Sequence, residues 1–191
     1  MTTVFTVREA GPADYLAMVE LLDAEDFGEH GRQCRQALDA GCRMDGHWQV
    51  AVAGRPSNPA TTVVGVVHAD LAIDYGDLVA NRGHQPPHAF ISAIVIDPAH
   101  RRRGVGRGLL QAVAAAAAKR GSRFLVLVPQ DGDSAGNDPA AFFRACGLVA
   151  LEAHIEGVPT RYGAPVADVV RARREITQSF DLRSVGTGGF A

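Results

Sequence analysis

The chain has 191 residues, 47% of them hydrophobic and 21% charged, and a formal net charge of −2. This length suits one domain with a sizeable core, and the composition is typical of a soluble globular protein, which excludes a disordered chain and a broadly nucleic-acid-binding one. Three cysteines without a C-x-x-C pair indicate neither a disulfide framework nor a metal site. The sequence has no signal-peptide pattern and no apolar stretch of ~20 residues, so we expect a cytoplasmic protein with no membrane partner.

The first half of the chain predicts a strand, two helices and a hairpin. The second helix is expected to begin only after residues 27–31 (FGEHG), which break the helical pattern. Residues 72–87 contain glycine, asparagine and two prolines and predict a long irregular loop, which is uncommon unless it covers a site or is disordered. The expected elements are a strand at 4–7, helices at 15–22 and 33–40, and hairpin strands at 48–53 and 61–71.

The second half predicts a strand pair joined by a helix, followed by smaller elements. The pair is expected to be parallel because a helix intervenes. We expect one domain over residues 1–176 and a C-terminal tail over residues 177–191. The predicted elements are strands at 90–96 and 124–128 with a helix at 104–120 between them, a helix from 138 to 146, and strands at 148–154 and 166–172, the last of which also fits a helix.

Glycines and arginines are concentrated where the strand at 90–96 passes into the next helix. A helix start presents backbone N–H groups without intrahelical partners and the positive end of the dipole, so it binds phosphate. Glycines at 104, 106 and 108 would let a phosphate approach these amides, and the neighbouring arginines add charge. A Walker loop is excluded by the missing Gly-Lys-Ser/Thr, and a Rossmann turn by Leu109 at the third glycine position. We therefore expect a pyrophosphate ligand of another kind.

Two motifs resemble those of the GCN5-related N-acetyltransferase (GNAT) superfamily. Residues 101–106 (RRRGVG) match its acetyl-CoA signature R/Q-x-x-G-x-G/A, and the lead-in strand ends in 94–98 (IVIDP). Asn137, Ala140, Phe143 and Gly147-Leu148 fall where the superfamily carries N-x-x-A-x-x-(Y/F)-x-x-x-G-(F/L). The resemblance implies an α/β fold with a mixed, mostly antiparallel sheet of six to seven strands, about four flanking helices and a splayed central strand pair.

The resemblance also implies how acetyl-CoA would be bound. A bulge near Ser92 to Ile94 would open a slot for the cofactor. The backbone of Ile94 and Ile96 would pair with the pantetheine arm, and the amides of residues 102–107 would hold the pyrophosphate. The cofactor-binding residues that it implies are Ile94, Val95, Ile96, Arg101, Arg102, Arg103, Gly104, Val105, Gly106, Arg107, Asn137 and Phe143.

The residues that would catalyse acetyl transfer are less clearly indicated. The N–H of Ile94 is the candidate oxyanion donor. Phe143 stands where the superfamily has a thiolate-protonating tyrosine, so Tyr162, Cys146 or water would have to substitute, or the thiolate would leave unassisted. The common base position on the strand at 90–96 has no carboxylate or imidazole; His88 is the leading candidate base, and His68 and Asp70 on the adjacent strand are others.

For the acceptor, carboxylates cluster after the first helix, on the side that lines the acceptor in this superfamily. Asp26 and Glu29 of this cluster, together with Asp70, are candidate contacts for a cationic amine. The segments DFGEHG and GNDPAAFF resemble parts of aminoglycoside 3-N-acetyltransferases of the superfamily. We therefore expect acetyl transfer to a primary amine of a small molecule, such as an aminoglycoside or polyamine, by direct attack.

Three other functions remain open at the level of the sequence. Protein N-terminal or lysine acetylation would need an open groove. A non-catalytic acyl-CoA sensor would fit Phe143 and the missing carboxylate. Nucleic-acid binding through the arginines is disfavoured by the net charge and the lack of a second basic cluster. A homodimer is common in the superfamily, but no residue pattern indicates one here.

Overall fold

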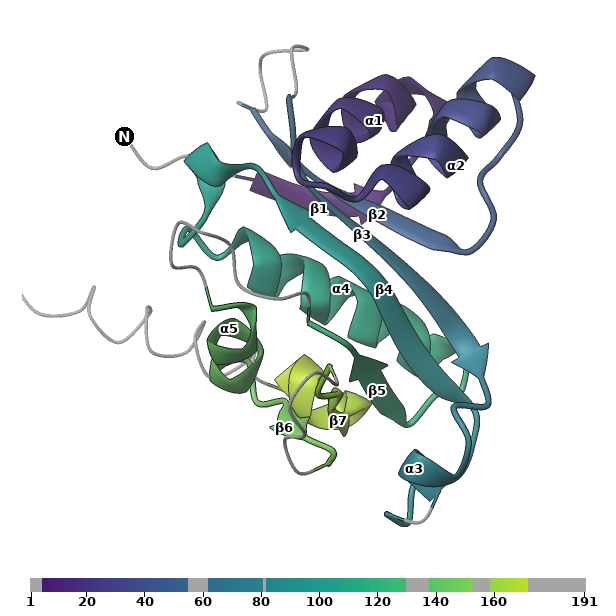
Figure 1. The fold of residues 1–191 in the computed structure, drawn as a ribbon, viewed down its shortest axis with the longest axis vertical. Coiled ribbons are helices and arrows are strands. Elements are labelled where there is room, and N and C mark those ends of the chain that lie inside the picture. Colours follow the sequence, from purple (N-terminus) through teal and green to yellow (C-terminus); the bar gives the residue numbers. More distant parts are fainter. Residues whose placement is uncertain (1–4, 55–61, 81, 130–137, 153–158, 172–191) are drawn as a thin grey trace, which may run out of the picture.

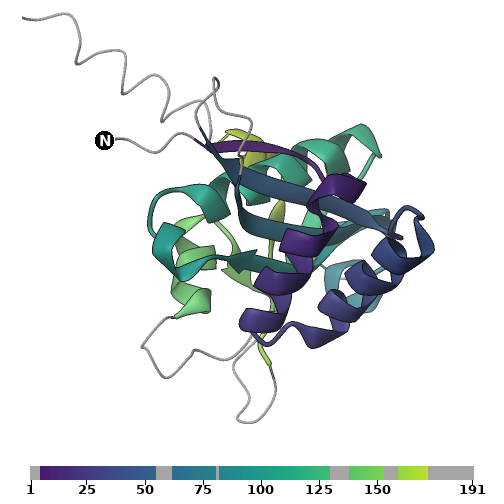
Figure 2. The same ribbon diagram turned by 90° about the horizontal axis from the view of Figure 1, so that it is seen from above.

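A seven-stranded sheet forms the centre of the protein, with helices packed on both faces (Figures 1 and 2). The computed structural model describes residues 5–54, 62–80, 82–129, 138–152 and 159–171. Its elements are, in order, β1 (Phe5–Glu9), α1 (Tyr15–Ala24), α2 (Gly28–Ala40), β2 (His47–Ala53), β3 (Thr62–Ile73), α3 (Asp77–Ala80), β4 (His88–Ile96), α4 (Val105–Lys119), β5 (Phe124–Leu127), α5 (Pro139–Ala145), β6 (Val149–Ala150) and β7 (Tyr162–Pro165).

The strands lie in the order β1-β2-β3-β4-β5-β7-β6. The β4–β5 pair is parallel and the other neighbouring pairs are antiparallel. The parallel pair arises because α4 carries the chain from the end of β4 back to the start of β5. The predicted mixed, mostly antiparallel sheet is therefore confirmed.

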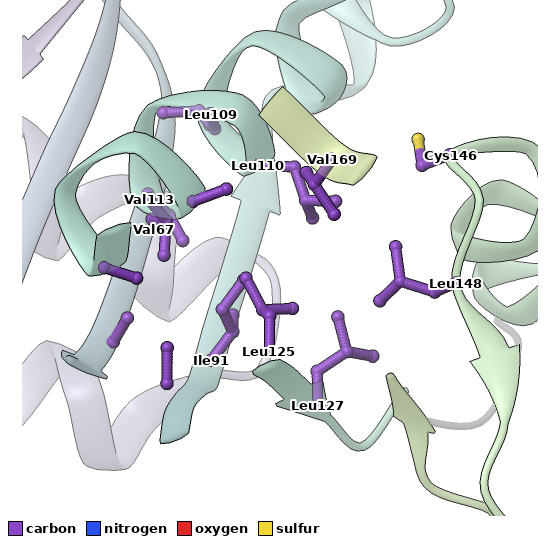
Figure 3. Packing of buried hydrophobic residues seen from close by; sticks show 14 of the residues in the cluster. Val67, Ile91, Leu109, Leu110, Val113, Leu125, Leu127, Cys146, Leu148 and Val169 are labelled. Carbon is purple, nitrogen blue, oxygen red and sulfur yellow. The ribbon is translucent and has the colours of Figure 1, made fainter. Parts of the chain in front are cut away.

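Each face of the sheet has its own hydrophobic core. On one face, α4 packs its buried side chains against β3, β4 and β5, as Figure 3 shows for Leu109, Leu110 and Val113 beside Val67 and Leu125. On the other face, α1 and α2 pack against Trp48, Val50 and Val66. In the part of the chain that the structure describes, no helix is long and apolar enough to cross a membrane.

The helix α2 begins at Gly28, five residues earlier than predicted. Its residues Gly31, Cys34 and Ala37 are buried and lie three apart, which places them on one face against α1. Gly31 lies against the Asp23 side chain of α1, which would have to move to admit a methyl group there. This glycine is part of the helix contact and does not break the helix, so His30 lies on a helix.

The segment after β3 is more regular than the predicted loop. The strand β3 continues to Ile73, and the short helix α3 buries Val79 against Phe124 and Val126 of β5. This segment therefore covers the start of β5.

The C-terminal part differs from the prediction in two elements. The strand that pairs with β5 is β7 at Tyr162–Pro165, and residues 166–171 are helical rather than a strand. Val166 and Val169 are buried while Ala167 and Asp168 are exposed, which is the periodicity of a helix. The strand β6 has only the two residues Val149–Ala150. The predicted tail at 177–191 and part of the predicted strand at 148–154 lie outside the described residues.

Candidate active site

The strand β4 carries a bulge at Ser92, as the resemblance implies. His68 of β3 faces Ala93, and Ala69 faces Ile91, so Ser92 is an extra residue without an opposing partner. The pairing of β4 with β5 also ends here, at Ile91 opposite Leu127, while β4 continues to Ile96 (Figure 1). The two strands thus separate from the bulge onward, which leaves Ile94, Val95 and Ile96 beyond the end of β5.

The start of α4 lies at the end of β4 and has the geometry of an anion site. Gly104 is the N-cap, with a φ of 85° that favours glycine, and a methyl group there would meet no atom within 4 Å. The N–H of Gly108 bonds to the Gly104 carbonyl at 3.0 Å, so the amides of Val105, Gly106 and Arg107 precede this first helical bond. The space beside Gly104 is open, and these amides and the helix dipole favour negative charge there.

The other two glycines of the motif leave room for neighbouring aromatic rings. A methyl group at Gly106 would lie 2.9 Å from Cζ of Phe142, and one at Gly108 would lie 3.0 Å from Cε2 of Phe5. These two glycines therefore admit the aromatic rings of α5 and β1, and only Gly104 opens space for a ligand.

We expect Gly106→Ala to destabilise the protein because the added methyl group would push the Phe142 ring and α5 away from α4. Overpacking of this kind costs about 1–3 kcal/mol of unfolding free energy. Urea unfolding would measure the loss, and Phe142→Leu should recover part of it when combined with Gly106→Ala. Simple additivity of the two substitutions would contradict this contact as the cause.

The arginines of the motif divide into two groups. Arg101 pairs with Glu25 at the end of α1 and donates from Nε to the Ile96 carbonyl at 3.1 Å, while Arg107 donates to the Ala145 carbonyl of α5 at 3.0 Å. These side chains tie the helix start to its neighbours instead of pointing at a ligand. Arg102 and Arg103 are exposed, and they are the arginines that we expect to meet phosphate.

His88, the leading candidate base, is fully buried and bonded at both ring nitrogens. Its Nδ1 accepts from the Tyr75 N–H at 3.0 Å, and its Nε2 lies 2.9 Å from the His84 carbonyl, to which it donates. Neither lone pair nor proton is left for a substrate, so His88 anchors the segment before β4 and is not placed to act as a base. The sequence could not reveal this because both partners are backbone groups of that segment.

The aromatic candidates lie on the α5 side of the sheet. The Phe143 ring is 4% exposed and packs edge-on against Phe142 with the ring centroids 5.0 Å apart. Tyr162 at the start of β7 accepts a hydrogen bond from Arg144 Nη1 at 3.1 Å, which leaves its own hydroxyl proton available. Asn137, predicted to contact pantetheine, lies outside the described residues.

The acidic residues predicted to attract an amine are largely paired with arginines. Of the four carboxylates at the end of α1 and the start of α2, three form ion pairs: Asp23 with Arg35, Glu25 with Arg101 and Glu29 with Arg32. Asp26 is exposed at a backbone φ of 61°, and Asp70 is exposed on β3. The pairing of Glu29 with Arg32 weakens the field that would steer a cation.

A cluster that the sequence prediction missed lies at the bulge. The Ser92 hydroxyl lies 3.1 Å from Nε2 of His30 and 2.6 Å from Nδ1 of His68. The His68 ring stacks on Trp48 at 4.3 Å, and the His30 ring contacts both edge-on. His30 was missed because its segment was expected to break the helix; the three-residue spacing of Gly31, Cys34 and Ala37 was the available signal.

Burial keeps both histidines of this cluster neutral. It lowers the pKa of His68 to about 4, with the neighbouring His30 adding to the effect. Burial also lowers the pKa of His30 below its usual 6.5, against an opposing influence from Glu29. Among the described residues, no group of three histidine, cysteine, aspartate or glutamate side chains is arranged to hold a metal ion.

Comparison with known proteins agrees with this geometry. The sequence model of the acetyltransferase (GNAT) family matches residues 16–148. The chain is 32% identical over 123 residues to the mycothiol acetyltransferase of Streptomyces coelicolor, an alignment that covers 63% of this chain and 38% of that protein. The chain thus spans less than half the length of this curated relative.

Solved structures share the fold at low sequence identity. An aminoglycoside 6'-acetyltransferase type Ii superimposes with a TM-score of 0.60 at 14% identity, covering 84% of this chain and 97% of that one. A GNAT family acetyltransferase from Brucella melitensis in complex with acetyl-CoA gives 0.53 at 14% identity, covering 85% and 88%. The family match, the end of the β4–β5 pairing at the Ser92 bulge and the open helix start at Gly104 agree, and this chain belongs to the GNAT acetyltransferase family.

Proposed function

We propose that the protein transfers the acetyl group of acetyl-CoA to a primary amine of a small molecule by direct attack. The observation that carries this proposal is the separation of β4 from β5 at the Ser92 bulge, directly beside the start of α4. A small-molecule acceptor is supported by the similarity to proteins named for mycothiol and aminoglycosides. The acceptor of this chain is therefore expected to be a small amine rather than a protein.

The donor site would use the backbone more than side chains. Acetyl-CoA supplies an activated acetyl group. The amides of Val105 to Arg107 would bind its pyrophosphate, and the exposed Arg102 and Arg103 would add charge-assisted contacts. The backbone of Ile94 and Ile96, beyond the end of β5, would bind the pantetheine arm as an added strand does.

The acyl group would then lie near the bulge, where Ile94 offers its N–H to the developing oxyanion. Tyr162 is the described residue that we propose as proton donor to the departing thiolate, because its hydroxyl accepts from Arg144 and can still donate. Both roles are part of this proposal.

Thiol release from acetyl-CoA across an amine panel tests the proposed acceptor class. The panel holds an aminoglycoside, spermidine, a peptide with a free N-terminus and a peptide with an internal lysine. We expect kcat/KM for at least one small amine to exceed that for both peptides by more than about 10-fold, the discrimination that one lost polar contact brings. Preferred turnover of a peptide would favour the protein acetyltransferase. Acetyl-CoA binding without turnover of any amine would favour a sensor.

We expect Tyr162→Phe to lower kcat about 10-fold or more with little change in KM, because only a late proton transfer is lost. Arg144→Gln, which keeps a donor near the hydroxyl, serves as the companion variant. An unchanged kcat in Tyr162→Phe would show that the thiolate leaves without this residue.

A further inference from the structure

We propose that His30 accepts the proton from the acceptor amine, and that Ser92 and His68 position it for this role. The inference rests on the proposed function, since it needs an amine acceptor at the bulge. It assigns a base at the bulge, since the predicted base His88 is bonded at both ring nitrogens.

The position of the three residues is the first argument. Ser92 is the bulge residue of β4, two residues before Ile94, and its side chain lies on the α2 face of the sheet, in contact with both histidines. His30 approaches from α2 and is half-buried, so its ring joins the core of that face while part of it stays accessible. The bulge therefore holds His30 beside the strand segment that separates from β5.

The direction of the hydrogen bonds is the second argument. His68 is neutral, so its Nδ1 can accept a proton from the Ser92 hydroxyl across 2.6 Å. The lone pairs of Ser92 are then left to accept from Nε2–H of His30 across 3.1 Å. With Nε2 protonated, the free lone pair of His30 is on Nδ1, which is the atom that would take the proton.

The surroundings of His68 disfavour its protonation, so it keeps accepting the hydrogen bond from the Ser92 hydroxyl. Its Nε2 is buried and has no hydrogen-bond partner of acceptable geometry, although the Asp45 carbonyl lies near enough to oppose part of the lowering of its pKa. A methyl group at Gly46 would collide with this nitrogen, and Trp48 covers the ring face. A proton passed to His68 would therefore be costly, so His68 orients Ser92 and the proton stays on His30.

The charges around His30 set the pH range in which it works. Glu29, the preceding residue of α2, raises the pKa of His30 and is itself paired with Arg32; burial outweighs it. On β3, His68 is uncharged at neutral pH and Asp70 acts on His68. Burial therefore lowers the pKa of His30 and favours the neutral imidazole, which can accept a proton.

The proton and bond changes balance as follows. An N–H proton of the bound ammonium moves to Nδ1 of His30, and the neutral amine forms its N–C bond to the thioester carbonyl. The C–S bond breaks, the thiolate takes its proton from Tyr162, the second proton of the nitrogen restores Tyr162, and His30 returns its proton to water. The products are an amide, free thiol and one proton.

The test compares kcat/KM against pH for four proteins, with acetyl-CoA and the amine that the wild type turns over best. His30→Gln keeps a donor at the Nε2 position but has no basic lone pair. Ser92→Ala removes the positioning hydroxyl. His47→Gln is the matched control, a half-buried histidine of β2 whose pKa is likewise lowered by burial and which bonds Gln49 outside the cluster. Circular dichroism and acetyl-CoA affinity confirm that each variant is folded and loaded.

We expect His30→Gln to lower kcat/KM about 100-fold at pH 7, within the range of general base catalysis. The wild type should show a plateau between a pKa below 6.5 and the pKa of the amine, whereas kcat/KM of His30→Gln should rise steadily with pH up to the amine pKa. Ser92→Ala should lower kcat with little change in KM for either substrate. Its kcat/KM should still decrease at low pH, but at a shifted pH. His47→Gln should match the wild type.

The possible results distinguish the role of His30 from the proposed function. Turnover by the wild type with an unchanged plateau in His30→Gln would overturn the role of His30 and leave the proposed function standing. An equal loss in His47→Gln would overturn it too, because the effect would then not be specific to the cluster. No turnover of any amine by the wild type would overturn the proposed function and this inference with it.

Discussion

Gly104→Asp is expected to weaken acetyl-CoA binding more than about 100-fold, or about 2.8 kcal/mol. The added carboxylate would occupy the open space beside the N-cap of α4, where no other atom lies within 4 Å. It would repel the pyrophosphate and compete for the amides of Val105 and Gly106. Titration calorimetry at fixed salt would measure the loss of affinity.

The fold should survive this substitution. A residue other than glycine at a φ of 85° costs about 1–2 kcal/mol, but an aspartate at a helix start is favourable and offsets part of the cost. Gly121→Asp is the matched control, because Gly121 has a φ of 86°, equally open surroundings and a place at the opposite end of α4. It should keep wild-type affinity. Equal losses in both variants would contradict a pyrophosphate site at Gly104.

Acidification from pH 6.5 to pH 4 is expected to lower the unfolding free energy by about 3 kcal/mol through His68 alone. Burial lowers the pKa of His68 from 6.5 to about 4, so the unfolded chain binds this proton over a range in which the folded protein does not. Stability is therefore fully present above pH 6.5 and declines as the pH falls toward 4. The lowered pKa values of Asp14 and Asp97 act at lower pH, since their usual value is 3.8.

Urea unfolding at steps between pH 7.5 and pH 4 would measure this slope. His68→Asn keeps an acceptor near Nδ1 toward Ser92 but cannot be protonated, so its stability should fall much less steeply with acid even if it is lower at neutral pH. The same slope in wild type and His68→Asn would mean that His68 is not the group responsible.

The sequence predicted the fold well where each element carries its own periodicity. The meander strands and α4 alternate or repeat their apolar residues clearly, and the helix between β4 and β5 predicted their parallel pairing. The prediction failed where tertiary contacts decide. The segment with Gly28 and Gly31 looked like a break because the contact of Gly31 with α1 is invisible in one sequence. For residues 166–172 the sequence left strand and helix open, and the helix is formed because β5 pairs with Tyr162–Pro165 instead.

The candidate site shows the same division. The helix start at Gly104 was predicted from the glycines that follow a strand, and the bulge at Ser92 was implied by the resemblance to the GNAT superfamily. The catalytic side chains depend on contacts between distant parts of the chain. His30 and Ser92 are 62 positions apart in the sequence. His88 is bonded to the backbone N–H of Tyr75, in a segment whose conformation the sequence did not predict. The packing of Phe142 of α5 against Gly106 could not be predicted for the same reason, because it joins two distant parts of the chain.

The most direct test of the account is a crystal structure of the protein with acetyl-CoA. We expect the pyrophosphate to bind the amides of Val105 to Arg107 and the pantetheine arm to lie along Ile94 and Ile96, beyond the end of β5. The acetyl group should lie beside the Ser92 bulge, with His30 facing it. Acetyl-CoA bound elsewhere, or a β5 that closes onto Ile94 and leaves no slot, would contradict it.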